Sequence, residues 1–201
     1  MEIIKLKPIS EQVFTIFFGH SHINICYNIL SCEKFILRRL IMAKLFFYYS
    51  TMAAGKSLEI IKVAYNYEIQ GKKVVTFTSH LDDRHEKGKI WSRAGFEMDA
   101  HIFDDDTNIK EKVLAFPERP ASVLIDEAQF LKKDHVLQLT ELVDDYDITV
   151  ICYGLKNDSF NHLFEGSKYL LLYADNIKEL KTECWFCHKK ATMNLRFDHE
   201  G

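Results

Sequence analysis

Apolar residues gather in short runs that are typical of buried β-strands and that recur along the chain. The clearest runs are 44–50, 73–79, the first half of 121–130 and 148–154, with a shorter one near 101–103. Continuous apolar runs of this length predict strands that are covered on both faces. The run at 44–50 reads as the first strand of a domain.

Segments with helical spacing separate these strands. Apolar positions recur every three or four residues in two of them: Ile60, Ala64 and Tyr67 before Gly71, and Val136, Leu139 and Val143 after Asp134. Asp134 is a candidate cap of the second helix, and a further helical piece is expected around 107–115. Strands alternating with helices predict an α/β fold, a parallel sheet with helices on both faces. Ligands of such sheets bind at the carboxyl ends of the strands.

Two segments depart from this pattern. Residues 82–100 are polar and are expected to be flexible. Residues 1–41 carry no clear period, and Met42 opens the first strand-like run. We expect Met42 to be the functional start. Residues 1–41 are then an upstream extension of the domain, either poorly ordered or a result of start-site choice.

The composition excludes some classes of protein. With 47% hydrophobic and 13% aromatic residues, the chain of 201 residues is not disordered. Its 26 basic and 29 acidic residues give a net charge of −3, so no overall basic field attracts a nucleic acid. These numbers favour a small anionic ligand that is held locally, and no nucleic-acid partner is expected.

The five cysteines are scattered and odd in number, which does not fit a secreted disulfide framework. No segment is apolar over the roughly 18 residues that a membrane helix needs. The best candidate, 13–19, is stopped by polar residues and lacks the flanks of a signal peptide. A cytoplasmic protein without a membrane partner is expected.

The first candidate for chemistry is Gly55-Lys56-Ser57, between the strand-like run at 44–50 and a predicted helix. The triplet alone is weak, since chance gives one in roughly every ten chains of this size. In this context, however, the backbone N–H groups of 53–57 and the helix N-terminus converge on one point, as in a phosphate-binding loop. Lys56 can then bridge the terminal phosphates and Ser57 can ligate Mg²⁺. The alternative is an ordinary strand-to-helix turn with a solvated lysine.

The second candidate is "VLIDEAQ", in which a buried strand runs into Asp126 and Glu127. Asp126 can hold Mg²⁺ through water as the partner of Ser57. Glu127 lies next to the metal ligand and can accept the proton of a hydroxyl that attacks a phosphate. An acidic turn that only faces solvent is the alternative.

These segments resemble one family, the type II thymidine kinases. The matching segments follow the family's order and spacing: "YYSTMAAGKS" (48–57), "DDR" (82–84), "SRAG" (92–95), "IDEAQFL" (125–131), "CYGL" (152–155), "LFEGSKYLL" (163–171) and "ELKTEC" (179–184). The family's phosphate loop begins with Gly or Ser, so Ser50 follows its pattern. The resemblance implies a P-loop NTPase fold of the RecA-like type over 42–177. It also implies a partial zinc-ribbon and lasso subdomain over 178–201.

The resemblance further implies the site. It assigns the binding of ATP to Ser50, Thr51, Met52, Ala53, Ala54, Gly55, Lys56, Ser57, Arg84, Asp126, Glu127, Ala128 and Gln129. Ser57 and Asp126 hold Mg²⁺, and Glu127 is the base that takes the 5′-hydroxyl proton of thymidine. The nucleoside pocket is assigned to Met52, Phe130, Phe160 and Phe164. Phe160 departs from the family pattern, because the aromatic residue is displaced by one position and a following Gly is absent.

Cys184 and Cys187 form the spacing of half a zinc site. In the family a second Cys-x-x-Cys/His pair some thirty residues downstream completes the site, and the lasso that grips the thymine base lies there too. His188 is a cramped candidate for a third ligand. Two free thiols and a c-type haem attachment site are the alternatives, and the second needs export.

Three functions compete. The first is a thymidine kinase that converts ATP and thymidine to ADP and dTMP and that, by family resemblance, assembles as a homo-tetramer. The second is a nucleic-acid-stimulated ATPase, prompted by "DEAQ", although a helicase core needs a second similar domain and only about seventy residues follow Gln129. The third is a relic that binds nucleotide without turnover.

Overall fold

The chain divides into two compact units, Met1–Met42 and Ala43–Gly201. The structure is a computed structural model that describes residues 12–18, 21–27, 43–82 and 86–196. In the first unit, β1 (Gln12–Phe18) and β2 (Ser21–Tyr27) pair antiparallel, with Gln12 opposite Tyr27. No strand was predicted from the sequence in this unit, so the hairpin is a correction. Its residues include β-branched and aromatic side chains that favour strands, and Ile23 and Ile25 of β2 alternate with His22 and Asn24.

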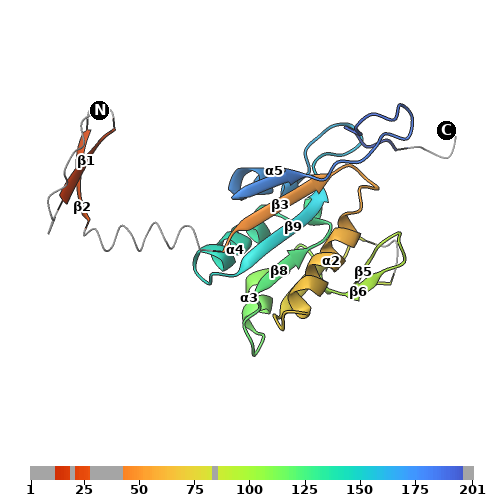
Figure 1. Ribbon diagram of the computed structural model, residues 1–201, viewed down its shortest axis with the longest axis horizontal. Coiled ribbons are helices and arrows are strands. Elements are labelled where there is room, and N and C mark those ends of the chain that lie inside the picture. Colours follow the sequence, from red (N-terminus) through yellow and green to blue (C-terminus); the bar gives the residue numbers. More distant parts are fainter. Residues whose placement is uncertain (1–11, 19–20, 28–42, 83–85, 197–201) are drawn as a thin grey trace, which may run out of the picture. The chain divides into compact units, whose positions relative to one another are not determined.

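A sheet of six strands, all paired in parallel, forms the centre of the second unit (Figure 1). Its strands are β3 (Leu45–Ser50), β4 (Val74–Ser79), β7 (His101–Phe103), β8 (Ser122–Ile125), β9 (Thr149–Leu155) and β10 (Asn176–Glu179). Their order across the sheet is β10-β3-β9-β8-β4-β7. The predicted α/β fold with a parallel sheet is therefore confirmed, and the strand-like runs of the sequence fall on β3, β4, β7, β8 and β9.

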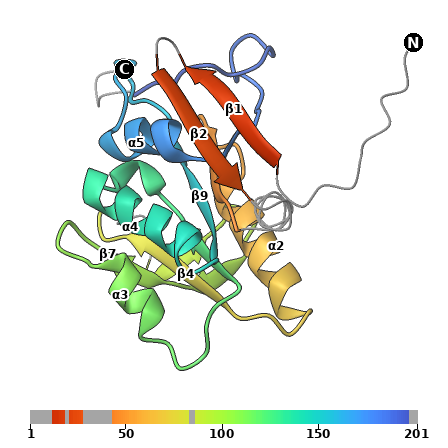
Figure 2. The same cartoon turned by 90° about the vertical axis from the view of Figure 1, so that its left-hand side faces the viewer.

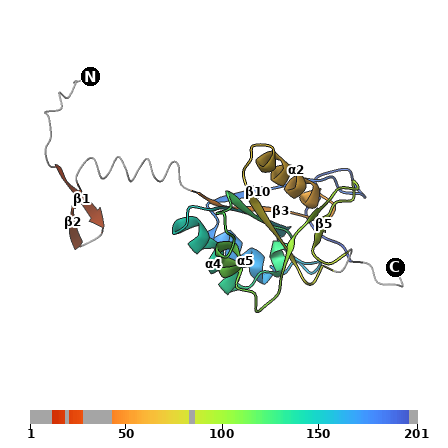
Figure 3. The ribbon, with the colours of Figure 1, turned by 90° about the horizontal axis from the view of Figure 1, so that it is seen from below.

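Helices cover both faces of this sheet, as predicted. The helix α2 (Lys56–Glu68) lies on one face, and α4 (Lys133–Asp144) and α5 (Glu165–Tyr173) lie on the other (Figure 3). The short helix α3 (Ile109–Leu114) lies beside α4, on the same side of the sheet as α4 and α5 (Figure 2). Because side chains alternate along a strand, Val123 packs into the core on the α4 side and its neighbour Leu124 into the core on the α2 side.

The polar segment before β7 is partly folded, which corrects the expectation of a flexible stretch. Within its described part, β5 (Lys89–Trp91) and β6 (Glu97–Asp99) form an antiparallel hairpin, and Ile90 is fully buried against α2. The Thr76 hydroxyl of β4 donates to the Asp99 carbonyl at 2.7 Å, which ties the hairpin to the sheet. A turn of 3₁₀ helix, η1 (Ala128–Phe130), follows β8.

The cap of α4 is Lys132 rather than the predicted Asp134. The Lys132 N–H donates to the His135 ring nitrogen Nδ1 at 3.1 Å, and Asp134 lies in the first turn of the helix. At that position its negative charge still interacts favourably with the positive end of the helix dipole. The side chain that hydrogen-bonds to the N-cap is therefore that of His135, three residues after Lys132.

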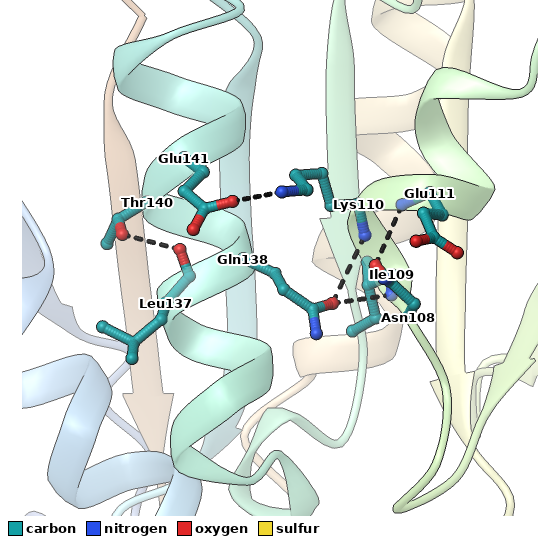
Figure 4. Close-up of polar contacts among 8 residues, drawn as sticks. All are labelled: Asn108, Ile109, Lys110, Glu111, Leu137, Gln138, Thr140 and Glu141. Atoms are coloured by element: carbon teal, nitrogen blue, oxygen red, sulfur yellow. Dashed lines mark hydrogen bonds and ion pairs between the residues drawn. The ribbon is translucent and has the colours of Figure 1, made fainter.

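Polar contacts join α3 to α4 (Figure 4). The Gln138 side-chain oxygen accepts the N–H of Ile109 at 2.8 Å, and the Lys110 ammonium pairs with Glu141. Asn108 caps α3 by accepting the N–H of Glu111 at 3.0 Å. The first turn of this short helix is thus satisfied partly by its neighbour, which fixes the two helices side by side.

Candidate functional site

The predicted phosphate loop connects β3 to α2. Two of its residues have left-handed backbone conformations, Ala53 with φ 63° and Gly55 with φ 77°. Glycine adopts this conformation without strain, whereas alanine does not, so the loop holds backbone strain at Ala53. Gly55 is the N-cap of α2, and no side chain caps the helix through a hydrogen bond to its first N–H groups. Such a helix start can take up an anion.

Lys56 folds back across the loop. It is nearly buried, and its ammonium donates to the Ser50 hydroxyl at 3.1 Å and to the Thr51 carbonyl at 3.4 Å. The Ser50 hydroxyl in turn donates to the Thr51 carbonyl at 2.7 Å. Ser50 therefore contributes a buried hydroxyl that holds the lysine, a contact that the glycine of the usual pattern cannot make.

The acidic turn follows β8, two strands away from β3. The Asp126 N–H still bonds to the Phe77 carbonyl of β4 at 2.8 Å, so Asp126 continues the strand. Glu127 has a left-handed backbone, with φ 52°, and its N–H donates to the Asp126 carboxylate at 2.9 Å. This kink ends the strand and turns the chain into η1.

Asp126 is fully enclosed and meets the phosphate loop. The Ser57 hydroxyl lies beside its carboxylate. Burial, and then the charge of Glu127, raise the pKa of Asp126 to about 7, while Lys56 and the Ser57 hydroxyl act in the opposite direction. Burial destabilises the ionised form of this carboxylate, and a nearby cation stabilises the ionised form again.

Gln129 holds Glu127 in place. Its side-chain amide donates to the Glu127 carboxylate at 2.5 Å, and its side-chain oxygen accepts the Leu155 N–H of β9 at 3.0 Å. Gly154 makes room for this contact, since a Cβ there would lie 2.9 Å from the Gln129 oxygen. The acidic turn is thereby fixed to the end of the neighbouring strand.

A cavity of about 490 Å³ lies over the loop and the acidic turn. Its lining consists of Met52, Ala53, Ala54, Gly55, Lys56, Ser57, Leu58, Leu81, Asp82, Trp91, Ser92, Arg93, Ala94, Glu127, Gln129, Phe130 and Leu155. The cavity brings a lysine, helix N–H groups and a carboxylate to one space at the carboxyl ends of the strands. This arrangement suits the binding of a phosphorylated ligand and the removal of a proton beside it.

Some of the predicted site residues line this cavity and others do not. Met52 to Ser57, Glu127, Gln129 and Phe130 line it, whereas Ser50, Thr51, Asp126 and Ala128 belong to the same two turns without lining it. Phe164 packs edge-on against Phe130, with ring centroids 6.1 Å apart. Phe160 is 76% exposed and stacks on His162, apart from the lining. Arg84 lies outside the described residues.

The turn of the β5–β6 hairpin forms a wall of the cavity that was not predicted from the sequence. Trp91 and Arg93 line the cavity there, and the turn closes at Gly95, whose φ is 85°. The signal was present in "SRAG", whose glycine ends a four-residue turn: the Gly95 N–H bonds to the Ser92 carbonyl at 2.9 Å. What the sequence could not show is that the hairpin packs against α2 and faces the loop.

Cys184 and Cys187 are free thiols on a short hairpin whose strands meet at the bridge from Glu183 to Lys190. Backbone N–H groups of Phe186 and Cys187 lower the pKa of Cys184. Within residues 43–82 and 86–196, no group of three or more histidine, cysteine or acidic side chains gathers that could hold a metal ion. The two thiols alone do not complete a zinc site, which normally takes four ligands.

No described helix is long and apolar enough to span a membrane.

Comparisons with known proteins agree with this geometry. The family model described as thymidine kinase matches residues 43–201. A thymidine kinase of Listeria innocua is 58% identical over 160 residues, which are 80% of this chain and 84% of the relative. Thymidine kinases of Shouchella clausii and Lactiplantibacillus plantarum are each 59% identical over 160 residues, 80% of this chain and 83% of each relative. The chain therefore belongs to the thymidine kinase family.

Proposed function

We propose that this chain is an ATP-dependent deoxynucleoside kinase that transfers the γ-phosphate of ATP to the 5′-hydroxyl of thymidine and yields dTMP. Membership of the thymidine kinase family supports this reaction. The observation that carries it is the single cavity in which Lys56 and Ser57 of the phosphate loop face Glu127 of the acidic turn. A nucleic-acid-stimulated ATPase and a relic without turnover have no comparable support.

The phosphate loop binds and orients the triphosphate. Backbone N–H groups at the start of α2 point at the phosphates, and the Lys56 ammonium supplies a positive charge close to them. In phosphoryl transfer the protein contributes mainly position and charge stabilisation. Lys56 is already held by Ser50 and Thr51, so it needs little reordering when ATP binds.

Mg²⁺ fits the pair of Ser57 and Asp126. A hydroxyl and a carboxylate are hard oxygen ligands of the kind that Mg²⁺ prefers, and the Ser57 hydroxyl lies close enough to the Asp126 carboxylate to oppose the rise of its pKa. When bound, Mg²⁺ neutralises charge on the β- and γ-phosphates. Binding of the cation also favours the ionised form of Asp126, whose pKa is raised in the unliganded protein.

Glu127 accepts the proton of the attacking 5′-hydroxyl. It lines the cavity beside the phosphate loop, and the Gln129 amide fixes one of its carboxylate oxygens. A base that is held in place within hydrogen-bond reach of the hydroxyl meets the requirement of general base catalysis. Met52 and Phe130 line the same cavity and offer apolar contacts to the nucleoside.

The proposal extends to cellular location, oligomeric state and a structural metal. Free thiols at Cys152, Cys184 and Cys187 suit a reducing cytoplasm. A homo-tetramer follows from the family resemblance alone. Cys184 and Cys187 supply two ligands toward a structural Zn²⁺, and we derive no catalytic step from that metal.

A coupled assay of ADP release tests the function. Purified protein with ATP and Mg²⁺ is offered thymidine, deoxyuridine or plain DNA as the acceptor. We expect turnover with thymidine and none that depends on DNA. DNA-stimulated turnover without nucleoside overturns the kinase assignment, and bound ATP without turnover on any acceptor favours the relic.

A further inference from the structure

Asn194 joins two loops that diverge at the centre of the sheet. β3 and β9 are neighbours, and their last residues, Ser50 and Leu155, lie opposite each other. Beyond that pair, β3 leads into the phosphate loop and α2 on one face of the sheet, and β9 leads to α5 on the opposite face. Such a switch point leaves a crevice in which ligands of open parallel sheets bind.

The Asn194 side chain spans this divergence with both ends of its amide. Its oxygen accepts the Met52 N–H at 2.8 Å, and its nitrogen donates to the Asn157 carbonyl at 3.0 Å. Met52 and Asn157 each lie two residues beyond the paired ends of β3 and β9. Asn194 is itself nearly buried, with 8% of its surface exposed, so its bond to Asn157 is shielded from water and its bond to Met52 is partly shielded.

The contact with Met52 connects Asn194 to the candidate site. Since the Met52 N–H is engaged by Asn194, the part of Met52 left for a ligand is its side chain, which is 48% exposed and lines the cavity. The N–H groups for phosphate then come from later positions of the loop. Asn194 sets where the loop begins and where the Met52 side chain lies.

The segment that carries Asn194 is anchored on its other side. The Ala191 N–H bonds to the Thr182 carbonyl at 2.8 Å, and the Cys184 N–H bonds to the Lys189 carbonyl at 2.6 Å. These bonds hold the hairpin that bears the two thiols, just before Asn194. The segment that presents the Asn194 side chain to the loop is therefore held by backbone hydrogen bonds.

We propose that Asn194 is a positioning residue of the nucleoside side of the site, acting through Met52. This inference rests on the proposed thymidine kinase activity for its kinetic effect, but its structural part does not. Loss of the side chain releases the Met52 N–H and lets the start of the phosphate loop move, so the apolar contact of Met52 with the nucleoside is lost first.

Three variants test the proposal. Asn194→Ala removes both bonds, Asn194→Ser keeps a shorter acceptor and donor, and Asn66→Ala, at an exposed position of α2, is the matched control. We expect the KM for thymidine to rise about 5-fold or more in Asn194→Ala, in line with the loss of a buried hydrogen bond, and by an intermediate factor in Asn194→Ser. Asn66→Ala leaves it unchanged. A merely structural role would lower the active fraction, and with it kcat, at an unchanged KM.

Hydrogen exchange separates this inference from the function itself. In the ligand-free protein, we expect the amide of Met52 to exchange roughly 10-fold faster in Asn194→Ala than in the wild-type protein. If the wild-type protein phosphorylates no nucleoside, the proposed function fails and the exchange result still decides the role of Asn194. If Asn194→Ala does not fold, Asn194→Ser against wild type decides it. Unchanged exchange at Met52, or an unchanged KM in variants that turn over, overturns the proposal.

Discussion

Two adjacent carboxylates occupy different environments at the end of β8. Asp126 is enclosed against the phosphate loop, whereas Glu127 turns into the cavity through its left-handed backbone. Burial and the neighbouring charge raise the pKa of Asp126 to about 7. The proposed roles follow from this difference, since a buried carboxylate gains most from a cation and one that lines the cavity can reach a substrate hydroxyl.

The raised pKa of Asp126 predicts how stability depends on pH. Below about pH 4, Asp126 is protonated in both the folded and the unfolded chain, because the unfolded pKa is about 3.9. Between there and pH 7 the folded state binds more protons, so Asp126 lowers the free energy of unfolding as the pH rises through this window. Urea unfolding without divalent cations, at several pH values, should show this slope, and Asp126→Asn should reduce it. An equal slope in both proteins contradicts the assigned pKa.

Replacement of Glu127 by Gln tests the proposed base. The shape of the side chain and an oxygen that accepts from the Gln129 amide are kept, but the carboxylate that takes up the proton is lost. We expect kcat with thymidine to fall ~10²-fold or more while ATP binding stays nearly the same. Glu68→Gln, at an exposed position of α2, is the control. A turnover rate that survives the change at Glu127 removes it as the base.

Among the secondary-structure elements, α5 approaches the acidic turn unusually closely. A Cβ at Gly166 would lie 2.4 Å from the Ala128 carbonyl oxygen and 2.8 Å from that of Leu131. Both oxygens belong to the backbone and cannot swing aside. Glycine is therefore required at this position for the first turn of α5 to pack on η1, which carries Gln129 and so supports Glu127.

Gly166→Ala is expected to lower the free energy of unfolding by about 1–3 kcal/mol, the usual cost of forcing extra atoms into a packed interior. Because the displaced backbone belongs to the acidic turn, kcat should fall as well. Thermal or urea unfolding measures the first effect, with Lys168→Ala on the exposed side of α5 as a comparison. Equal stability of Gly166→Ala and the wild-type protein would show that the two elements can separate without cost.

The elements that the sequence revealed are those with long apolar runs. β3, β4, β8 and β9 are largely buried on both faces, so most of their residues are apolar and the pattern is plain. The three-residue strands β5 and β6 are too short for a period to appear, and bonds from β4 hold them in place. In the β1–β2 hairpin the apolar run of β1 shows no alternation and that of β2 is short, with only Ile23 and Ile25 around Asn24, and the hairpin was missed.

Only part of the candidate site could be predicted from the sequence. The phosphate loop and the acidic turn each follow a strand in the sequence, and parallel strands bring their ends together, so their meeting could be predicted. Asn194 could not, because its bond to Met52 joins residues 142 positions apart and depends on how the last described segment folds back. The hairpin turn with Trp91 and Arg93 reaches the cavity for a similar reason.

For the molecule as a whole, the second unit should carry the activity by itself. The family match begins at residue 43, where the second compact unit also begins. We predict that a chain starting at Met42 unfolds with a free energy within about 0.5 kcal/mol of the full chain and phosphorylates thymidine at a similar rate. Side-by-side unfolding and kinetic assays measure both. A shortened chain that loses activity or aggregates assigns residues 1–41 a part in the folded protein.

The most direct test of the whole account follows the γ-phosphate of ATP. The purified chain is incubated with ATP labelled in that phosphate, with Mg²⁺ and thymidine, and the labelled products are separated. We predict that the label appears in dTMP, only when thymidine is present, and that Glu127→Gln nearly abolishes the transfer. Label released as inorganic phosphate, or transfer that Glu127→Gln leaves intact, would contradict the account.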